Sequence, residues 1–442
     1  MSKSRQLKHS SPQGPMRRVL GNFGFLVRGR GIAGLMLFGV TALMARTLGA
    51  AEFGFVVLIQ TYVLLLRGLF NFQLFDAIVR YGVPAQETED TPKLRRLLKI
   101  CWRVDRKAGL IATILGVMLA PIIAPSMGMN DHQTLLLALY SLVLITSIGN
   151  GTATGVLRLF DRFDIIGRQM IIGPSIRFIG VVIAWWLHCS MAIFVMILAL
   201  AFIIESLYLS WCGWREYRKK LEPATEEEKQ LKVKMKEFTG LKHFLWVTYW
   251  QANADIISKH IGILLAGYIL GPAEAGLLRL ARQFSSLLAK PAVLLRQVVF
   301  PDLTRSWREG SGHFKLVAYR TALLGAAMGF VFVLGGYFYG DVILDTLVGK
   351  EYIAAAPILT LLLLAATFDL SASSLRAAAY AIGYAAQVLK LYVLSVIIYL
   401  SLFFILTARM GLIGAGVAAC IAAVIPLIAM AVLIYKKTIT GS

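Results

Sequence analysis

The chain has 442 residues, of which 58% are hydrophobic and 16% are charged, and its formal net charge is +21. This hydrophobic fraction and the mean hydropathy of +0.70 exclude a soluble globular protein. In such proteins only about 45 to 50% of the residues are apolar. The bases lie in loops between apolar runs, so their excess is explained by membrane topology and not by binding of nucleic acid. We expect anionic lipid headgroups to be the partners of these bases. Apolar runs of about 20 residues, enough for an α-helix to cross a bilayer, recur along the chain. We therefore predict an all-α polytopic membrane protein.

The first part of the chain predicts six membrane helices. Residues 1–17 form a polar, basic arm that we expect in the cytoplasm, and residues 18–214 form an N-terminal six-helix half. The basic amphipathic segment Lys93–Lys107 is expected to lie along the inner membrane surface before the third helix. The six helices are expected at residues 21–46, 53–78, 108–125, 135–160, 170–187 and 192–214.

Hydropathy falls sharply near the middle of the chain. Residues 215–237 carry charges of both signs and predict a cytoplasmic linker. Residues 238–437 predict a C-terminal six-helix half, and residues 438–442 predict a cytoplasmic tail. The helices of this half are expected at residues 244–270, 276–300, 316–339, 353–375, 388–408 and 412–435.

A short motif occurs once in each half. Residues 48–54 read LGAAEFG, and residues 270–276 read LGPAEAG. Each copy separates two long apolar runs, which indicates an internal repeat. Because each half has six helices, an even number, both halves enter the membrane from the same side, so the repeat is parallel and leaves a cleft between the halves. Gly49 and Gly54 are expected to allow a tight turn.

The loops alternate between rich and poor in bases along the chain. The base-rich set includes the N-terminal arm, residues 93–107 and residues 215–236. Cytoplasmic loops of membrane proteins carry an excess of Lys and Arg. We therefore expect about twelve membrane helices, with both termini in the cytoplasm.

Charged side chains within the predicted helices mark the candidate site. Each costs about 2.5 to 3.5 kcal/mol at membrane depth on an insertion scale, and bases outnumber acids. A cationic cleft favours an anionic substrate, and Arg suits phosphate because its planar guanidinium donates two hydrogen bonds at once. The candidate substrate-binding residues are Arg28, Arg30, Arg67, Arg177, Lys259, Arg282, Lys290 and Lys390. The candidates for proton or sodium coupling are Glu205, Asp255 and Asp369.

Structural explanations stay open for five of these residues. Arg67 lies about 21 Å from the outer end of the second helix at 1.5 Å per residue, a distance that its side chain could span only when fully extended toward the headgroups. Arg28 and Arg30 lie near the inner end of the first helix, from which their side chains can extend to cytoplasmic headgroups. Asp255 and Lys259 stand at i,i+4 with the acid first, the order in which they can form an ion pair on one helix.

The sequence contains no Walker motif and no catalytic constellation of side chains. The four cysteines are scattered without metal-type spacing. We therefore predict no enzyme activity, no metal site and no cofactor.

The first copy of the motif extends to a longer signature. Residues 45–54, ARTLGAAEFG, resemble the "ARxLGxxxFG" signature that closes the first helix of Wzx-type polysaccharide flippases, in the MATE-like multidrug/oligosaccharidyl-lipid/polysaccharide exporter superfamily. The second copy, with Phe300-Pro301 at the end of the eighth helix, is similar to the corresponding part of that family's C-terminal half. The plan of six plus six helices extends the resemblance to essentially the whole chain.

The resemblance implies a V-shaped bundle in the bacterial inner membrane that opens alternately to the cytoplasm and the periplasm. Its substrate would be a polyprenyl-pyrophosphate-linked oligosaccharide, with the pyrophosphate held by bases in the central cavity. A glycan polymerase and export machinery are the implied partners. Two alternatives are a cation-coupled multidrug exporter with the same fold and a non-transporting membrane scaffold for a glycan-assembly complex. A drug-cation exporter should have a cleft of the opposite charge.

Overall fold

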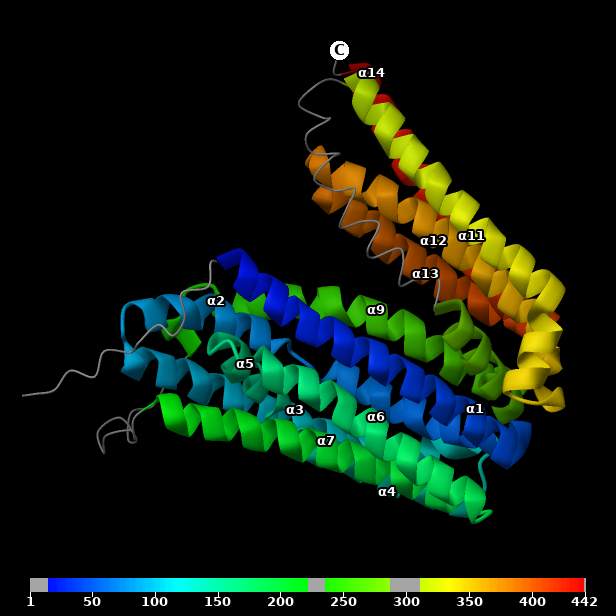
Figure 1. Ribbon diagram of the computed structural model, residues 1–442, viewed down its shortest axis with the longest axis horizontal. Helices are drawn as coiled ribbons and strands as arrows, with labels where there is room; N and C mark the ends of the chain where they lie inside the picture. Colours follow the sequence, from blue (N-terminus) through cyan, green and yellow to red (C-terminus); the bar gives the residue numbers. More distant parts are fainter. Residues whose placement is uncertain (1–14, 222–234, 287–310, 441–442) are drawn as a thin grey trace, which may run out of the picture.

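A computed structural model describes residues 15–221, 235–286 and 311–440, and helices with short connections account for nearly all of them. The helices form two arms of a V (Figure 1). The larger arm contains α1 to α7, with α9 lying along it, and the smaller arm contains α11 to α14. This arrangement confirms the predicted fold class of an all-α polytopic bundle.

The first arm is built from helices of very different length. They are α1 (Pro15–Leu69), α2 (Leu74–Glu87), α3 (Thr91–Ser126), α4 (Asp131–Ser141), the 3₁₀ helix η1 (Leu142–Ser147), α5 (Asn150–Leu159), α6 (Phe163–Trp186) and α7 (Met191–Lys220).

The remaining elements follow the central linker. They are the 3₁₀ helix η2 (Met235–Glu237), α9 (Leu241–Leu270), a helix at residues 272–286, α11 (Ser311–Leu347), the 3₁₀ helix η3 (Lys350–Ala355), α12 (Ala356–Ala381), α13 (Ala385–Met410) and α14 (Leu412–Thr440).

The described residues contain nine segments that are long and apolar enough to cross a membrane. The first, Gly31–Glu87, is 57 residues long and includes the point at Gly49 where α1 turns back on itself, so it holds two crossings (Figure 1). The 30 residues of α9 and the helix at 272–286 bring the plan to the expected twelve.

Both motif glycines have the same unusual backbone conformation. Gly49 has φ 71° and ψ 173°, and Gly271 has φ 100° and ψ 175°. Positive φ is strained for residues with a Cβ and is readily adopted by glycine. The expected turn at Gly49 is confirmed, but Gly54 plays another part, because it lies inside the second section of α1 without positive φ.

The two copies of the motif pack against each other. A Cβ added at Gly54 would overlap the carbonyl oxygen of Pro272, and one added at Gly276 would lie 3.3 Å from Cα of Gly54. The absence of side chains at both positions lets the backbones of the two halves approach closely. We call this end of the V the closed end.

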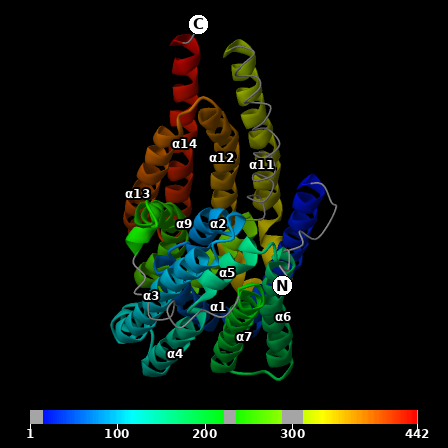
Figure 2. The same ribbon diagram turned by 90° about the vertical axis from the view of Figure 1, so that its left-hand side faces the viewer.

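Polar contacts join the two arms at the closed end. The backbone N–H of Ala50 donates to Oε2 of Glu351 at 3.0 Å, and the buried hydroxyl of Tyr352 donates to the Ala45 carbonyl at 3.0 Å. Arg46 also donates to the carbonyl of Thr346. The largest hydrophobic cluster includes Phe53 and Tyr352, whose rings meet edge to face. The arms separate toward the opposite end, which we call the open end and which carries the start of α1 and the end of α14 (Figures 1 and 2).

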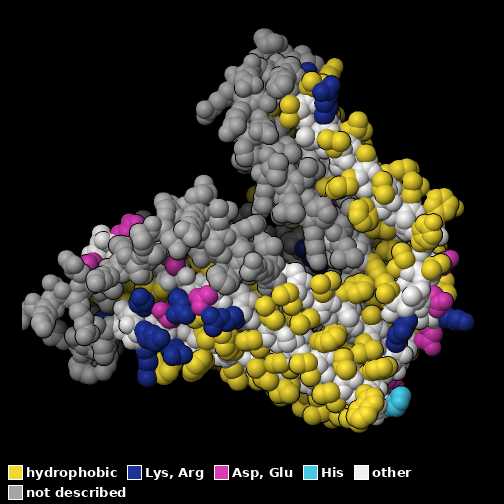
Figure 3. All heavy atoms as spheres, in the orientation of Figure 1, with side chains coloured by type: hydrophobic (Ala, Val, Ile, Leu, Met, Phe, Trp, Pro, Cys, Tyr) yellow, Lys and Arg dark blue, Asp and Glu magenta, His cyan; other side chains and the backbone are white. Residues whose placement is uncertain are grey.

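Side-chain type follows this geometry on the visible face of the molecule. Hydrophobic side chains cover the middle of the larger arm, and Lys and Arg gather toward its open end (Figure 3). Arg215 and Arg218 at the end of α7 are exposed. On this face the described bases of the larger arm therefore lie mainly toward its open end (Figure 3).

Three stretches of the first half differ from the prediction by more than a shift of helix ends. Lys93–Lys107 is not a separate surface helix, because it continues without a break into the third helix as α3, with Leu97 and Cys101 buried. The second helix ends at Leu69, after which α2 starts anew at Leu74. The fourth is interrupted by η1 and by Gly149, which has φ 88°. Of the predicted linker, residues 222–234 lie outside the described residues.

Candidate functional site

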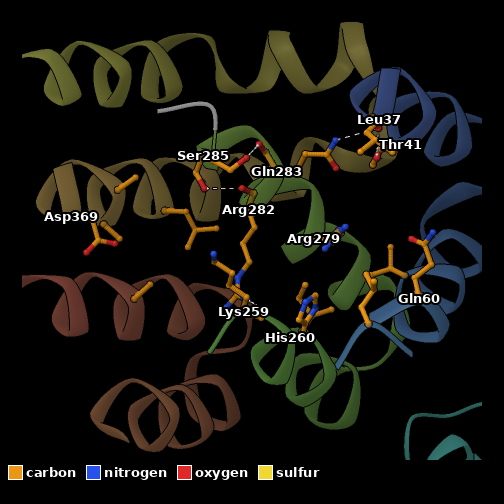
Figure 4. Close-up of a pocket in the computed structure, with 18 of the residues that line it drawn as sticks. Leu37, Thr41, Gln60, Lys259, His260, Arg279, Arg282, Gln283, Ser285 and Asp369 are labelled. Atoms are coloured by element: carbon orange, nitrogen blue, oxygen red, sulfur yellow. Dashed lines mark hydrogen bonds between the residues drawn. The ribbon is translucent and has the colours of Figure 1, made fainter. Parts of the chain in front are cut away.

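A cavity of about 770 Å³ lies between the two arms of the V. The first half of the chain contributes α1, α6 and α7 to its lining, and the second half contributes α9, the helix at 272–286, α12, α13 and α14. Figure 4 shows lining residues of α1, α9, the helix at 272–286 and α12 around the cavity. Its described lining has one carboxylate, Asp369, against five cationic side chains. The cationic residues are Arg177, Lys259, Arg279, Arg282 and Arg376.

The lining is divided between polar and apolar elements. The helix at 272–286 contributes Gln283, Ser285 and Ser286 beside its two arginines, and α13 contributes Ser395 and Tyr399. The helices α1 and α14 supply mainly apolar residues. The apolar lining residues of these two helices are Leu37, Phe38, Val40, Met44, Phe53, Val57, Leu64, Ala419, Ala422, Ala423 and Pro426. A molecule with an anionic, hydroxyl-rich part and an apolar part would find a matching surface for each.

Arg282 is held in position by groups on two neighbouring helices. Its Nη1 donates to the carbonyl of Lys259 on α9 at 2.7 Å, and its Nη2 donates to the hydroxyl of Tyr399 on α13. The guanidinium lies over Gly262, where an added Cβ would stand 2.6 Å from Nη2. Glycine at position 262 therefore leaves a notch that admits the guanidinium, and Tyr399 keeps it oriented.

Gly262→Ala is expected to displace the guanidinium of Arg282 from the Tyr399 hydroxyl, because the added Cβ would lie 2.6 Å from Nη2 of Arg282 and 2.9 Å from that hydroxyl, and the guanidinium is the flexible end of a side chain. If Arg282 binds the substrate, transport should fall about tenfold, since a hydrogen bond to a charged group contributes roughly 1.5 to 3 kcal/mol. Gly335→Ala is the matched control, because no atom lies within 4 Å of a Cβ at that position. Equal transport rates of these two variants in proteoliposomes would contradict a role for the Arg282 position.

Arg177 connects the cavity to a polar cluster inside the first half. It lines the cavity, and its Nη2 lies 3.2 Å from Oε2 of Glu205 on α7. The other carboxylate oxygen of Glu205 accepts a hydrogen bond from Gln169 at 2.7 Å. Arg67 lies nearby, with Cζ 4.7 Å from the centroid of the Phe202 ring. Glu205 therefore neutralises part of the positive charge on this side of the cavity.

The structure brings together only some of the predicted site residues. Arg177, Lys259, Arg282 and Asp369 line the cavity, and Arg67 and Glu205 stand behind its wall beside Arg177. Lys390 is exposed on α13 and is not part of the lining. Arg28 and Arg30 lie in α1 and Asp255 lies in α9, but their side chains are outside the described set, and Lys290 is outside it altogether.

Two lining bases were absent from the predicted set. Arg279 lies one helical turn before Arg282, and this spacing was a usable signal. Arg376 lies one residue beyond the predicted end of the tenth helix at residue 375, whereas α12 continues to Ala381. The roles of Gly262 and Tyr399 had no sequence signal, because they depend on how three helices meet.

The comparisons with known proteins agree with this fold. The chain is 26% identical to the inner membrane protein YghQ of Escherichia coli K12 over 356 residues, which cover 79% of this chain and 98% of YghQ. Among solved structures, it is similar to an inward-facing multidrug resistance MATE family transporter of the MOP superfamily, with a TM-score of 0.70 over 93% of this chain and 96% of that one at 13% identity. It is also similar to the lipid II flippase MurJ in an inward closed conformation, with a TM-score of 0.71 over 92% of this chain and 86% of that one at 14% identity.

These structural similarities concern the fold, and the family follows from the sequence. The model of one family matches residues 19–307, which is more than half of the chain. The match includes the first copy of the motif, both arginines of the helix at 272–286 and the Arg177–Glu205 pair. It confirms the resemblance noted at residues 45–54. The chain is a multi-pass membrane protein that belongs to the polysaccharide biosynthesis protein family, with the fold of the MOP superfamily transporters.

Proposed function

We propose that the protein flips polyprenyl-pyrophosphate-linked oligosaccharides across the bacterial inner membrane for polysaccharide biosynthesis. The observation that carries the proposal is the cationic cavity between the arms, which has five bases and one carboxylate in its described lining. Bases outnumber carboxylates in the described lining of this cavity of about 770 Å³, so an anion is the ligand whose charge complements it. The family and the fold also support a function as a flippase.

The described conformation suggests how transport begins. The arms meet at the closed end and diverge at the open end, toward which the bases gather. With both termini in the cytoplasm, as the positive-inside rule favours, this is a cytoplasm-open state. The head group would enter between the arms while the lipid tail stays in the bilayer.

The second half of the cycle follows from alternating access. The anion would draw the bases of the two halves together, Arg177 from one side and Arg279 and Arg282 from the other. Rocking of the halves would then separate the contacts at the closed end, such as Ala50 to Glu351. Asp369 in the cavity wall and Glu205 behind it are the described candidates for proton or sodium coupling, and Asp255 is a third on α9.

The charge of the cavity also bears on the alternatives. A multidrug exporter of the same fold that moves organic cations would need an acidic cavity, so the excess of bases favours the flippase. A non-transporting scaffold for a glycan polymerase and export machinery would need no polar cavity between its arms.

Reconstitution tests the proposal directly. The protein in liposomes should move a labelled lipid-linked oligosaccharide between leaflets, and it should not accumulate a cationic dye. The matched control is the same liposomes with a membrane protein of unrelated fold. Failure to move any lipid-linked oligosaccharide would exclude the flippase and favour a scaffold, and export of the dye would favour the multidrug exporter.

A further inference from the structure

The arginine of the signature at residues 45–54 lies outside the described lining of the cavity. Arg46 is exposed at the closed end, and its guanidinium donates to the carbonyl of Thr346, in the last turn of α11. The last four carbonyls of a helix have no partner within the helix, and a cation beside them also complements the helix dipole. Arg46 of the larger arm therefore caps a helix of the smaller arm.

The smaller arm in turn caps α1 through η3. Because α1 is interrupted at Gly49, its second section begins at Ala50 with N–H groups that lack helical partners. The carboxylate of Glu351 accepts a hydrogen bond from the Ala50 N–H at 3.0 Å, and a negative charge is favourable at this end of a helix. The next residue, Tyr352, donates to the Ala45 carbonyl at 3.0 Å. Two consecutive residues of η3 thus hold α1 on both sides of its turn.

These three contacts between the arms differ in their exposure to water. Tyr352 is 1% exposed and Ala45 is fully buried, and a buried polar group that loses its partner is costly. Arg46 and Glu351 are exposed, and ionic contacts of exposed groups contribute little each. Together the contacts favour the closed arrangement and still allow it to open.

We propose that Arg46, Glu351 and Tyr352 form an outer latch, which closes the V because each arm completes helix ends of the other. The inference rests on the alternating access proposed above, and it assigns the arginine of the signature to gating and not to substrate binding. The latch opens when the cavity faces the outside and forms again on return. Since the backbone groups that it holds lie at a turn and at a helix end, the arms can part without breaking hydrogen bonds inside a helix.

One-sided thiol labelling tests the latch without any substrate. A cysteine replaces Val57, which is 3% exposed and lines the cavity, in the full chain with its four native cysteines changed to alanine. The protein is reconstituted in proteoliposomes of uniform orientation, and a membrane-impermeant maleimide is added on the side of the closed end. Arg46→Ala and Glu351→Ala are each expected to raise the labelling rate about fivefold, equivalent to about 1 kcal/mol, because each removes a contact between the arms.

Conservative variants separate capping from the mere loss of charge. Glu351→Gln keeps an acceptor for the backbone N–H, and Arg46→Lys keeps a donor for the carbonyl, so both should raise the labelling rate less than the alanine variants do. Tyr352→Phe removes only the hydroxyl and should also raise the rate. Lys350→Ala is the matched control, because Lys350 is an exposed residue of the same 3₁₀ helix. It should keep the rate of the unmodified latch.

Labelling from the side of the open end distinguishes opening from unfolding. Rocking of the arms predicts faster labelling from the closed end only, whereas unfolding would raise the rates from both sides. If an alanine variant unfolds, Tyr352→Phe, which keeps the ring, provides the same comparison.

Two results would overturn the latch. One is an unchanged labelling rate from the closed end in the variants that stay folded, and the other is an equal rate for the alanine and the conservative variants. Flipping of a lipid-linked oligosaccharide by the unmodified protein is measured separately, so failure of the latch leaves the proposed function standing.

Discussion

Arg177→Glu is expected to reduce flipping of a lipid-linked oligosaccharide at least about 100-fold, equivalent to about 2.7 kcal/mol or more, without preventing membrane insertion. The change removes a base from the cavity wall. It also places a second carboxylate beside Glu205, whose Oε2 lies 3.2 Å from Nη2 of Arg177 in the unmodified protein. A charge-assisted hydrogen bond to the substrate is lost, and a repulsive charge takes its place. Arg168→Glu is the matched control on the same helix, because the Arg168 side chain is 70% exposed and lies outside the cavity lining.

A charge swap separates substrate binding from a structural role of the same ion pair. In Arg177→Glu with Glu205→Arg, both charges remain and the pair can form again, but the base now belongs to α7 behind the wall. We expect the swap to restore thermal stability and not transport. Recovery of transport by the swap would mean that Arg177 serves only to neutralise Glu205. Arg67→Glu should also abolish flipping, and full transport in both single reversals would exclude the anion cavity.

Much of the fold could be predicted from the sequence, because few backbone structures can cross a lipid bilayer. A bilayer requires helices of a set length, so hydropathy placed the crossings, and the turns at Gly49 and Gly271 followed from a residue that tolerates positive φ. Helix ends were less certain, since apolar composition changes gradually there. The extension of α12 to Ala381 moved Arg376 from a predicted loop into the cavity wall.

The site was harder to predict than the fold, because the sequence does not say which residue of another helix a charged side chain contacts. Arg177 and Glu205 were each selected for their depth, on different helices, and only the packing of α6 on α7 places them 3.2 Å apart. Lys390 was predicted by the same criterion, yet it is exposed and does not line the cavity. Depth follows from position along one helix, whereas the face that a side chain presents depends on the neighbouring helices.

The shared motif has a structural meaning that the repeat alone did not reveal. Its first glycine turns the chain in each half, and its last glycine brings the two halves into backbone contact. Sequence similarity identified corresponding positions, but contact between the copies is a tertiary feature. The same residues thus define the turn of each half and the surface on which the halves meet.

Gly54→Ala is accordingly expected to open the closed end and to abolish transport. Its Cβ would overlap the Pro272 carbonyl oxygen, and because both atoms belong to backbone or Cβ, neither can rotate away. Overpacking of this kind costs about 1 to 3 kcal/mol, which would shift the balance between closed and separated arms by roughly 5-fold to 150-fold. Spin labels at the exposed positions 52 and 350 in a cysteine-free background, measured by pulsed EPR, should report a longer distance across the closed end.

A graded series of glycine substitutions gives the matched controls. At Gly276 the added Cβ would be 3.1 Å from the Phe53 ring and 3.3 Å from Cα of Gly54, so Gly276→Ala should produce a smaller increase in distance. At Gly335 it would meet nothing within 4 Å, and the distance should not change. Thermal stability measured in parallel identifies a variant that has simply failed to fold. If Gly54→Ala has the same spin-label distance and the same transport rate as Gly335→Ala, the glycines do not set the contact between the halves. If the increase in distance and the loss of transport decline from Gly54 through Gly276 to Gly335, the glycines do set that contact.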